Sequence, residues 1–413
     1  MKKIYNIVLT VLSIIVLSWF LPWLYSILLP TAASDPFVAY SPINNKLILS
    51  ELGNDDTRIY SVDSQGVPED VSYTKEQRDS LLPQIYYTQL MARNELPDSI
   101  DGIELSVAAF KHNQWVFSSI PRDINKVLPR VYLIMESMPA RIDLEDPKQV
   151  FRIHGNDVEF IDIATNTIDE GRSKRFTEVF NERGFVFPMQ HFSANITSRK
   201  PYDEGYLITD VAGGLYHLKM RAGRPYMMKI PLPANVKAEY VFIMENPENS
   251  HLGLFTDTDN NLYIIEREGY NVVRLQVGKF DATREKISIM KNLFNWVVRI
   301  SDAQGSRWTA LSAADYSPLA SYTRDYPEST ASKSAKYIFP FELSFTNVAD
   351  CYAVPRITDI SWQALFLNLI LAVIICFIYL CRRKYTKKCA AGASVTTLVF
   401  GIFAFIPFMV LKN

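Results

Sequence analysis

The chain has 413 residues, a net charge of -1 and 48% hydrophobic residues. A chain of this length exceeds one ordinary globular core, so two or more structural units are expected. The near-zero net charge removes the general electrostatic argument for binding nucleic acid, and no nucleic-acid partner is predicted.

The first predicted element is a transmembrane helix over residues 4–29. This run is almost wholly apolar and follows Met1, Lys2 and Lys3. It is long enough to cross a hydrocarbon core of about 30 Å as a helix. Because a cleaved signal peptide has a shorter apolar region, the sequence favours an uncleaved amino-terminal anchor.

Residues 35–359 are predicted to form one mainly β domain. Short runs with alternating apolar and polar residues are separated by clusters of Gly, Asn, Asp and Pro, which is typical of strands and tight turns. The one cysteine in this region, Cys351, has no partner there and is expected to be a buried apolar residue.

A helical insertion is predicted within this domain at about residues 74–96. Thr74 with Gln77 three residues later matches a capping box, and Pro83 suits the first turn of a second helix. Pro97 is expected to end that helix. The insertion is expected to pack against the β domain through an apolar face that includes Leu82.

A repeat predicts the fold of the β domain. Residues 206–218 and 253–265 share Thr-Asp and Leu-Tyr pairs at one fixed offset, and residues 297–310 form a weaker third copy. A period of roughly 40 to 50 residues made of four short strands is typical of β-propeller blades. The predicted fold class is therefore mainly β and β-propeller-like, with room for roughly five to seven blades.

The second copy of the repeat contains a candidate calcium loop. Asp257, Asp259 and Asn261 alternate, and Glu268 occupies the twelfth position, as in an EF-hand-type loop. The sixth position, which needs glycine for the sharp turn, is Leu262. The first copy keeps the turn but loses the other ligands, so a hairpin turn is favoured and calcium binding is left open.

Two more transmembrane helices are predicted at residues 360–380 and 390–411. Residues 381–389 between them form a basic loop that contains two arginines and three lysines. The positive-inside rule places this loop and the amino terminus in the cytoplasm. The expected protein is a multi-pass protein of the cytoplasmic (inner) membrane, with residues 35–359 outside the cytoplasm.

No catalytic, cofactor-binding or metal-binding residue is predicted. The five histidines have no metal-ligand spacing and are expected at turns or on the surface: His112, His154, His191, His217 and His251. A nucleophile elbow and a glycine-rich phosphate loop are both absent from the sequence. The chain is therefore not expected to be an enzyme.

The segment LLPQIYYTQL at residues 81–90, followed by ELPDSIDG at residues 95–102, resembles an uncharacterised family of bacterial envelope proteins, a domain of unknown function. The resemblance covers nearly the whole chain. It implies an amino-terminal anchor, a large outer domain and a carboxy-terminal membrane hairpin. It also implies genes encoded beside the ATPase and permease components of ABC transporters, and it transfers no catalytic residue.

Three functional hypotheses follow. The first is a non-enzymatic, membrane-anchored accessory subunit of a bacterial ABC-type transport system, with the outer domain binding a ligand or an envelope partner. The alternative is an envelope enzyme, for example a hydrolase with carboxylates at a propeller mouth. A sensor is the third, but the cytoplasmic loop at residues 381–389 is too short to fold into an output domain.

Overall fold

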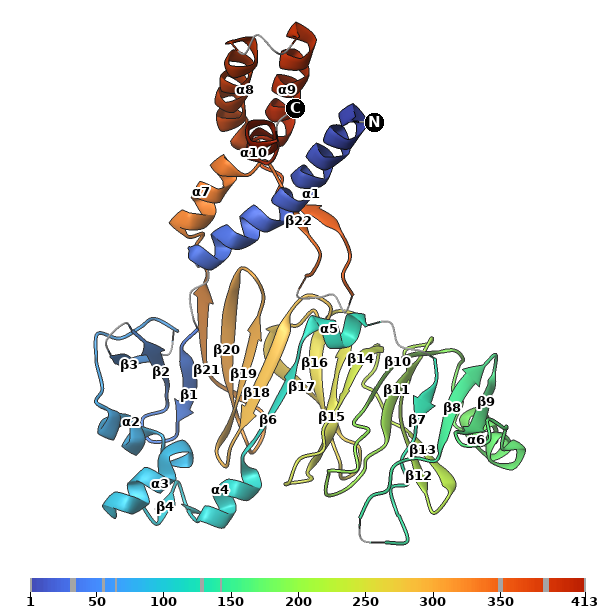
Figure 1. Ribbon diagram of the computed structural model, residues 1–413. Coiled ribbons are helices and arrows are strands. Elements are labelled where there is room, and N and C mark those ends of the chain that lie inside the picture. Colours follow the sequence, from blue (N-terminus) through green and yellow to red (C-terminus); the bar gives the residue numbers. More distant parts are fainter. Residues whose placement is uncertain are drawn as a thin grey trace. The chain divides into compact units, whose positions relative to one another are not determined.

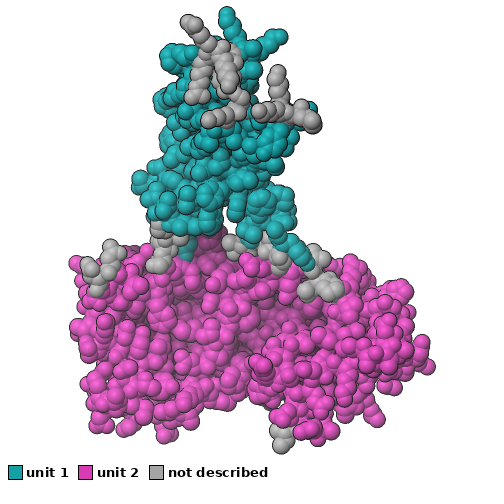
Figure 2. All heavy atoms as spheres, viewed as in Figure 1, with its two compact units in different colours: residues 1–34, 326–413 teal, residues 35–325 magenta. Residues whose placement is uncertain are grey.

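The chain divides into two compact units. The computed structural model describes residues 2–29, 35–53, 56–63, 65–126, 130–141, 143–347, 352–381 and 386–411. Residues 1–34 and 326–413 form one unit and residues 35–325 form the other (Figure 2). Residues 326–359, which the sequence analysis assigned to the outer domain, belong to the unit that contains the apolar helices.

Antiparallel sheets make up most of the 35–325 unit (Figure 1). A three-stranded sheet contains β1 (Phe37–Ser41), β2 (Lys46–Leu52) and β3 (Thr57–Val62). Another contains β7 (Tyr132–Leu133), β8 (Gln149–His154) and β9 (Asp157–Asp162).

Three larger sheets complete the series. One contains β10 (Met189–Ala194), β11 (Tyr206–Asp210), β12 (Leu215–Arg221) and β13 (Arg224–Lys229). The next contains β14 (Ala238–Ile243), β15 (His251–Asp257), β16 (Asn261–Glu266) and β17 (Val272–Lys279). The third has the order β21 (Pro318–Asp325), β20 (Gly305–Ser312), β19 (Asn295–Ser301), β18 (Lys286–Lys291) and β6 (Trp115–Ser119), so an early strand joins the last sheet.

The remaining elements of this unit are short. They are α2 (Lys75–Leu81), α3 (Pro83–Arg93), the hairpin of β4 (Ser99–Ile100) and β5 (Ile103–Glu104), α4 (Val107–Asn113), α5 (Pro121–Asn125) and α6 (Glu170–Glu182). The predicted insertion is confirmed, because the backbone N–H of Gln77 donates to Thr74 Oγ1 at 3.2 Å and that of Thr74 donates to Gln77 Oε1 at 2.9 Å. Pro83 opens α3 as predicted, and Asn94 ends it in the left-handed conformation.

The five sheets pack face to face in one series. Separate apolar clusters fill the successive interfaces: one around Leu47 and Trp308, one around Trp296 and Leu254, one around Phe255 and Leu207, and one around Tyr206 and Phe160. In Figure 1 the series runs from β1–β3 at the left to β7–β9 at the right. No apolar cluster among the described residues joins these two end sheets, so the series is open.

The mainly β prediction is confirmed, and the repeat corresponds to three hairpins. These are β11–β12, β15–β16 and β19–β20, which lie at the centre of three successive sheets. In the first two turns the Oδ2 atoms of Asp210 and Asp257 accept hydrogen bonds from the hydroxyls of Tyr216 and Tyr263, at 3.0 and 2.9 Å. The repeated Asp and Tyr therefore stabilise the same hairpin turn in both copies.

The other unit is mainly helical. It contains α1 (Lys2–Leu28), α7 (Thr330–Ile338), the hairpin of β22 (Glu342–Ser344) and β23 (Arg356–Thr358), α8 (Ala364–Cys381), α9 (Lys387–Phe400) and α10 (Ile402–Val410). Among the described residues, two helical segments are long and apolar enough to cross a membrane, Ile4–Leu28 and Ala364–Cys381. They agree with the first and second predicted spans.

The prediction that residues 390–411 form a single membrane-spanning helix is wrong. The helix is interrupted at Gly401, which lies between α9 and α10 and has a φ of 55°. A Cβ atom at this position would lie 2.1 Å from Oδ1 of the buried Asn368, so only glycine fits. Asn368 Nδ2 donates to the carbonyl of Leu398 at 3.1 Å and so packs α8 against the end of α9.

Parts of two predictions lie outside the described residues. They are Cys351 and residues 382–385 of the basic loop. Lys387 and Lys388, which the prediction placed in that loop, form the first turn of α9.

Candidate functional site: a groove between the edge strands

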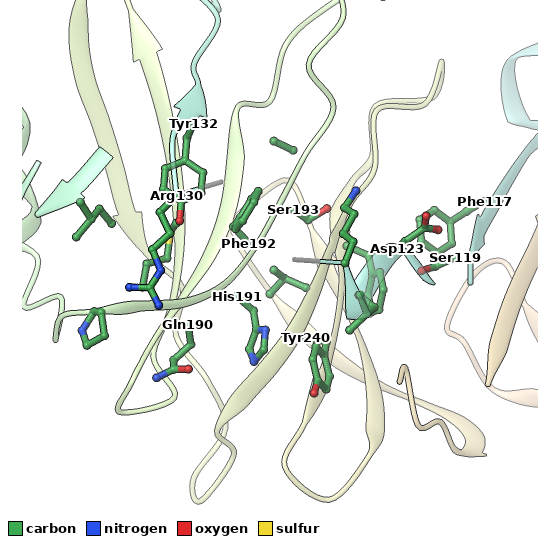
Figure 3. Close-up of a pocket in the computed structure, with 18 of the residues that line it drawn as sticks. Phe117, Ser119, Asp123, Arg130, Tyr132, Gln190, His191, Phe192, Ser193 and Tyr240 are labelled. Atoms are coloured by element: carbon green, nitrogen blue, oxygen red, sulfur yellow. The ribbon is translucent and has the colours of Figure 1, made fainter. Parts of the chain in front are cut away.

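A groove of about 590 Å³ lies where four sheets of the β unit meet (Figure 3). Four of the strands that line it, β6, β7, β10 and β14, are terminal strands of their sheets, and β8 completes the wall. Its lining includes Phe117, Ser119, Asp123, Lys126, Arg130, Tyr132, Gln190, His191, Phe192, Ser193, Tyr240 and Phe242. The edges of several sheets thus contribute to one concave surface.

Aromatic rings form much of the wall. The His191 and Tyr240 rings lie side by side in Figure 3 with centroids 4.5 Å apart. Tyr132 and Phe192 meet edge to face at 4.9 Å. Burial lowers the pKa of His191 and raises that of Tyr240, so both side chains are neutral at pH 7. The wall therefore offers stacking surfaces without a charge of its own.

Charged side chains also line the groove, with Arg130 and Asp123 on opposite sides of it in Figure 3. Lys126 and Arg130 are exposed, and neither forms an ion pair with the residues that the structure describes. Asp123 is the acidic residue in the lining, and its Oδ2 accepts a hydrogen bond from the backbone N–H of Ile120 at 3.2 Å. Two cations against one carboxylate favour a ligand that carries an anionic group.

A buried ionic network stabilises the sheets beside the groove. Three acidic and three basic side chains form ion pairs with one another. They come from the β10–β13 and β14–β17 sheets and from the segment before β11: Asp203, Glu204, Glu245, Lys200, Lys219 and Arg267. Lys200 Nζ lies 2.7 Å from both Asp203 and Glu245, and Arg267 lies 2.8 Å from Glu204. Since every charge has a partner, the network is structural rather than a free binding site.

His217 belongs to this network and is almost fully buried. Its Nε2–H donates to the carbonyl of Glu204 at 2.7 Å, and Nδ1 accepts from the Tyr270 hydroxyl at 2.8 Å. Burial, reinforced by Lys219 and Arg267, lowers the pKa of His217 to about 3. The imidazole is therefore neutral at physiological pH.

His251 is also buried and lies at a second, open hollow of about 610 Å³ between the β14–β17 sheet and the sheet that ends in β6. Its Nδ1 is 2.6 Å from Ser250 Oγ, and its Nε2 is 2.8 Å from the Tyr316 hydroxyl. Tyr316 in turn donates to Glu266 Oε1 at 3.2 Å. Four side chains are thus connected by hydrogen bonds at the wall of an acidic hollow.

The expectation that all five histidines lie at turns or on the surface is wrong for His217 and His251. His217 lies within β12 and His251 is the first residue of β15, and the burial of each side chain is compensated by two hydrogen bonds. His191 is half-buried in the groove, and only His112 and His154 are exposed. Both strands are buried along nearly their whole length, and their largely apolar sequences, LYHLKMR and HLGLFTD, were the available signal for the two buried histidines.

The hairpin interpretation of the candidate calcium loop is confirmed. Asp257 Oδ1 accepts from the backbone N–H groups of Asp259 and Asn261 at 2.9 and 2.8 Å, and Oδ2 accepts from Asn261 Nδ2 at 2.7 Å. Glu268 lines the hollow beside His251 instead. Within the described ranges, no three His, Cys, Asp or Glu side chains are placed to hold a metal ion.

The groove itself was missed by sequence reasoning. Lys126, Arg130, His191 and Tyr240 come from separate sheets and connecting segments, and no spacing motif relates them. Their convergence depends on β6 joining the last sheet, because this pairing brings the segment after β6 beside β10 and β14.

Residues 37–311 match the model of one protein family, described as "Domain of unknown function (DUF4857)". No curated protein matches the chain in sequence. Solved structures that resemble it include the β-propeller domain of Myceliophteria thermophila Cps50 (Swd1), at 8% identity and a TM-score of 0.24, covering 73% of this chain and 89% of that one. Another is the Dos1 propeller, at 10% identity and a TM-score of 0.27, covering 71% and 62% of the two chains.

Proposed function

Because this chain belongs to the DUF4857 family, whose description assigns no function, we propose a role from its geometry. The protein is a membrane-anchored, non-enzymatic accessory subunit of a bacterial ABC-type transport system. Its β unit is an incomplete propeller outside the cytoplasm, and the groove between the edge strands holds a ligand.

The groove is the observation that carries this proposal. Its volume of about 590 Å³ is within the usual range for small-molecule sites, which combine an apolar wall with a few polar groups. Tyr240, His191 and Phe192 supply the apolar wall, and Arg130 with Lys126 supplies positive charge. A ligand with a planar or apolar body and an anionic group fits this chemistry.

The anchor in this proposal depends on two helices. Ile4–Leu28 and Ala364–Cys381 have the length and composition of membrane spans. The helices α9 and α10 are 14 and 9 residues long, and a helix needs about 20 residues to cross. In this proposal they pack beside α8 and form the docking surface for a permease.

Native mass spectrometry of the full-length protein from its own membrane tests the ligand site. We expect a bound small molecule in the wild type and at least about tenfold lower occupancy in Tyr240→Ala and Arg130→Ala, because stacking and charge are lost. Arg183→Ala is the matched control, since Arg183 is exposed at the end of α6. Equal occupancy in all four proteins would place the ligand elsewhere.

A second candidate is the envelope hydrolase, which the hydrogen-bonded chain from Ser250 through His251 and Tyr316 to Glu266 favours. A serine beside a buried neutral imidazole has the arrangement of a nucleophile and its base. Full-length protein would then hydrolyse an activated ester such as p-nitrophenyl acetate, and Ser250→Ala would abolish turnover. No turnover above that of Ser250→Ala would remove this candidate.

A further inference from the structure

The β7–β9 sheet at one end of the series has an apolar outer face. Its inner face packs on α6 and the next sheet through Phe151, Val158 and Phe160. On the opposite face, Leu133 pairs with Val150, Val150 pairs with Ile161, and Ile161 bridges to Ile168. These four aliphatic side chains, called here the aliphatic row, lie in register across the sheet.

The aliphatic row is exposed at its two ends, and its central members Val150 and Ile161 are half-buried. Leu133 is 39% exposed and Ile168 is 43% exposed, and neighbouring Ile163 is 53% exposed. No member of the row belongs to an apolar cluster of the described residues. A contiguous apolar row on a sheet face of a folded domain indicates an interaction surface.

Charges beside the row are arranged in complementary pairs. Arg152 on β8 faces Glu159 on β9, with a distance of 2.6 Å between Nε and Oε2. One step further, His154 on β8 pairs in register with Asp157 on β9. The outer face thus carries the positive charge of Arg152 on β8 and the acidic groups Glu159 and Asp157 on β9.

This arrangement is self-complementary under a two-fold rotation. The axis lies in the plane between the two copies, runs parallel to the strands, and passes midway between β8 and β9. It places β8 of one copy over β9 of the other. Val150 then lies over Ile161 of the second copy, and Arg152 over its Glu159. Two such faces would stack about 10 Å apart, as packed sheets generally do.

We propose that the outer face of the β7–β9 sheet is the contact between two copies of this chain. A three-stranded face buries less than the roughly 800 Å² per partner of a standard interface, so the contact is weak in dilute solution. The membrane anchor of the proposed function confines both copies and raises their effective concentration. The inference depends on the proposed function only for this tether, not for the ligand or the ABC partner.

Charge variants of the full-length protein test the contact in membranes. Two differently tagged copies are co-expressed, crosslinked in the membrane, and quantified after purification through one tag. We expect the wild type to recover its second copy, and Arg152→Glu alone or Glu159→Arg alone to recover about tenfold less, because like charges then face one another.

Mixing the two variants separates the contact between copies from the ion pair within one copy. Each variant lacks its own Arg152–Glu159 pair, yet a copy with Arg152→Glu and a copy with Glu159→Arg present opposite charges at both sites of the two-fold contact. We expect this mixture to recover the second copy to near the wild-type amount. Recovery no better than in either single variant would overturn the proposal.

Two further substitutions control for the apolar part and for folding. Ile161→Asp should abolish recovery of the second copy, whereas Leu52→Asp, at a residue that is 79% exposed on β2, should leave it unchanged. Melting temperatures identify any variant that fails to fold. A wild-type protein that recovers a different protein through this face, and no second copy, would also overturn the proposal.

Discussion

Both end sheets of the β unit have an apolar outer face, but among the described residues only the face of the β1–β3 sheet is covered by another element of the chain. The outer face of the β1–β3 sheet presents Ala39, Ile48 and Ile59, and the helical insertion covers them with Leu82. The outer face of the β7–β9 sheet presents an aliphatic row of similar character without a covering element. The difference indicates that an apolar end face is completed by the chain itself at one end and by another molecule at the other.

The largest expected effect is at the covered end. Leu82 is fully buried over the β1–β3 sheet, so Leu82→Ala should lower the free energy of unfolding by about 2–5 kcal/mol. The matched control, Leu52→Ala, changes a leucine of β2 that is 79% exposed and should cost less than about 0.5 kcal/mol. Chemical denaturation measures both, and equal effects would mean that the insertion does not complete the sheet.

The second prediction concerns an interior interface, where polar groups are buried between sheets. The pKa of His217 is lowered to about 3 by burial, with Lys219 and Arg267 adding to it, against about 6.5 when unfolded. Between pH 6.5 and pH 3 the unfolded chain therefore binds more protons than the folded chain. The contribution of His217 to the free energy of unfolding is fully present above pH 6.5 and is lost as the pH falls toward 3. Between pH 6.5 and 5 the loss should be about 2 kcal/mol.

His217→Gln provides the control for this pH dependence. Glutamine keeps a hydrogen-bond donor and acceptor but does not titrate, so denaturation at several pH values should show a flatter profile. If the variant and the wild type lose stability equally between pH 6.5 and 5, another group is responsible.

A smaller effect is expected at the start of the covering helices. Thr74 caps α2 through the hydrogen bond that its Oγ1 accepts from the backbone N–H of Gln77. Thr74→Ala should cost about 1 kcal/mol, and Thr74→Ser should cost much less because the hydroxyl is retained. Hydrogen exchange across residues 75–93 would show faster local opening in the alanine variant only.

The smallest effect is expected on the uncovered face. Ile168 is 43% exposed, and Ile168→Ala in dilute detergent should change the free energy of unfolding by less than about 0.5 kcal/mol. A loss as large as that of Leu82→Ala would show that this face is already covered within one chain, and the contrast between the two ends would be lost.

Local signals in the sequence were sufficient for several elements. The Thr74–Gln77 capping box, Pro83 and the Thr-Asp repeat predicted the helical insertion and two hairpins, because each depends on residues close together in the chain. The helix break at Gly401 was missed, since it depends on contact with Asn368 in another helix.

Long-range pairing explains why the site was not predicted. The groove exists because β6, at residues 115–119, pairs with β18, at residues 286–291. The burial of His217 and His251 likewise depends on which sheets become neighbours. Periodicity predicts that strands form but does not determine which distant strands share an interface.

The most direct test of the proposed role is a crosslinked, detergent-solubilised pull-down of the tagged full-length protein from its native membrane, quantified by mass spectrometry. The account predicts that an ABC ATPase and a permease are recovered in stoichiometric amounts. Recovery of this protein alone, or only with copies of itself, would contradict the accessory-subunit proposal and make the hydrolase candidate the next to test.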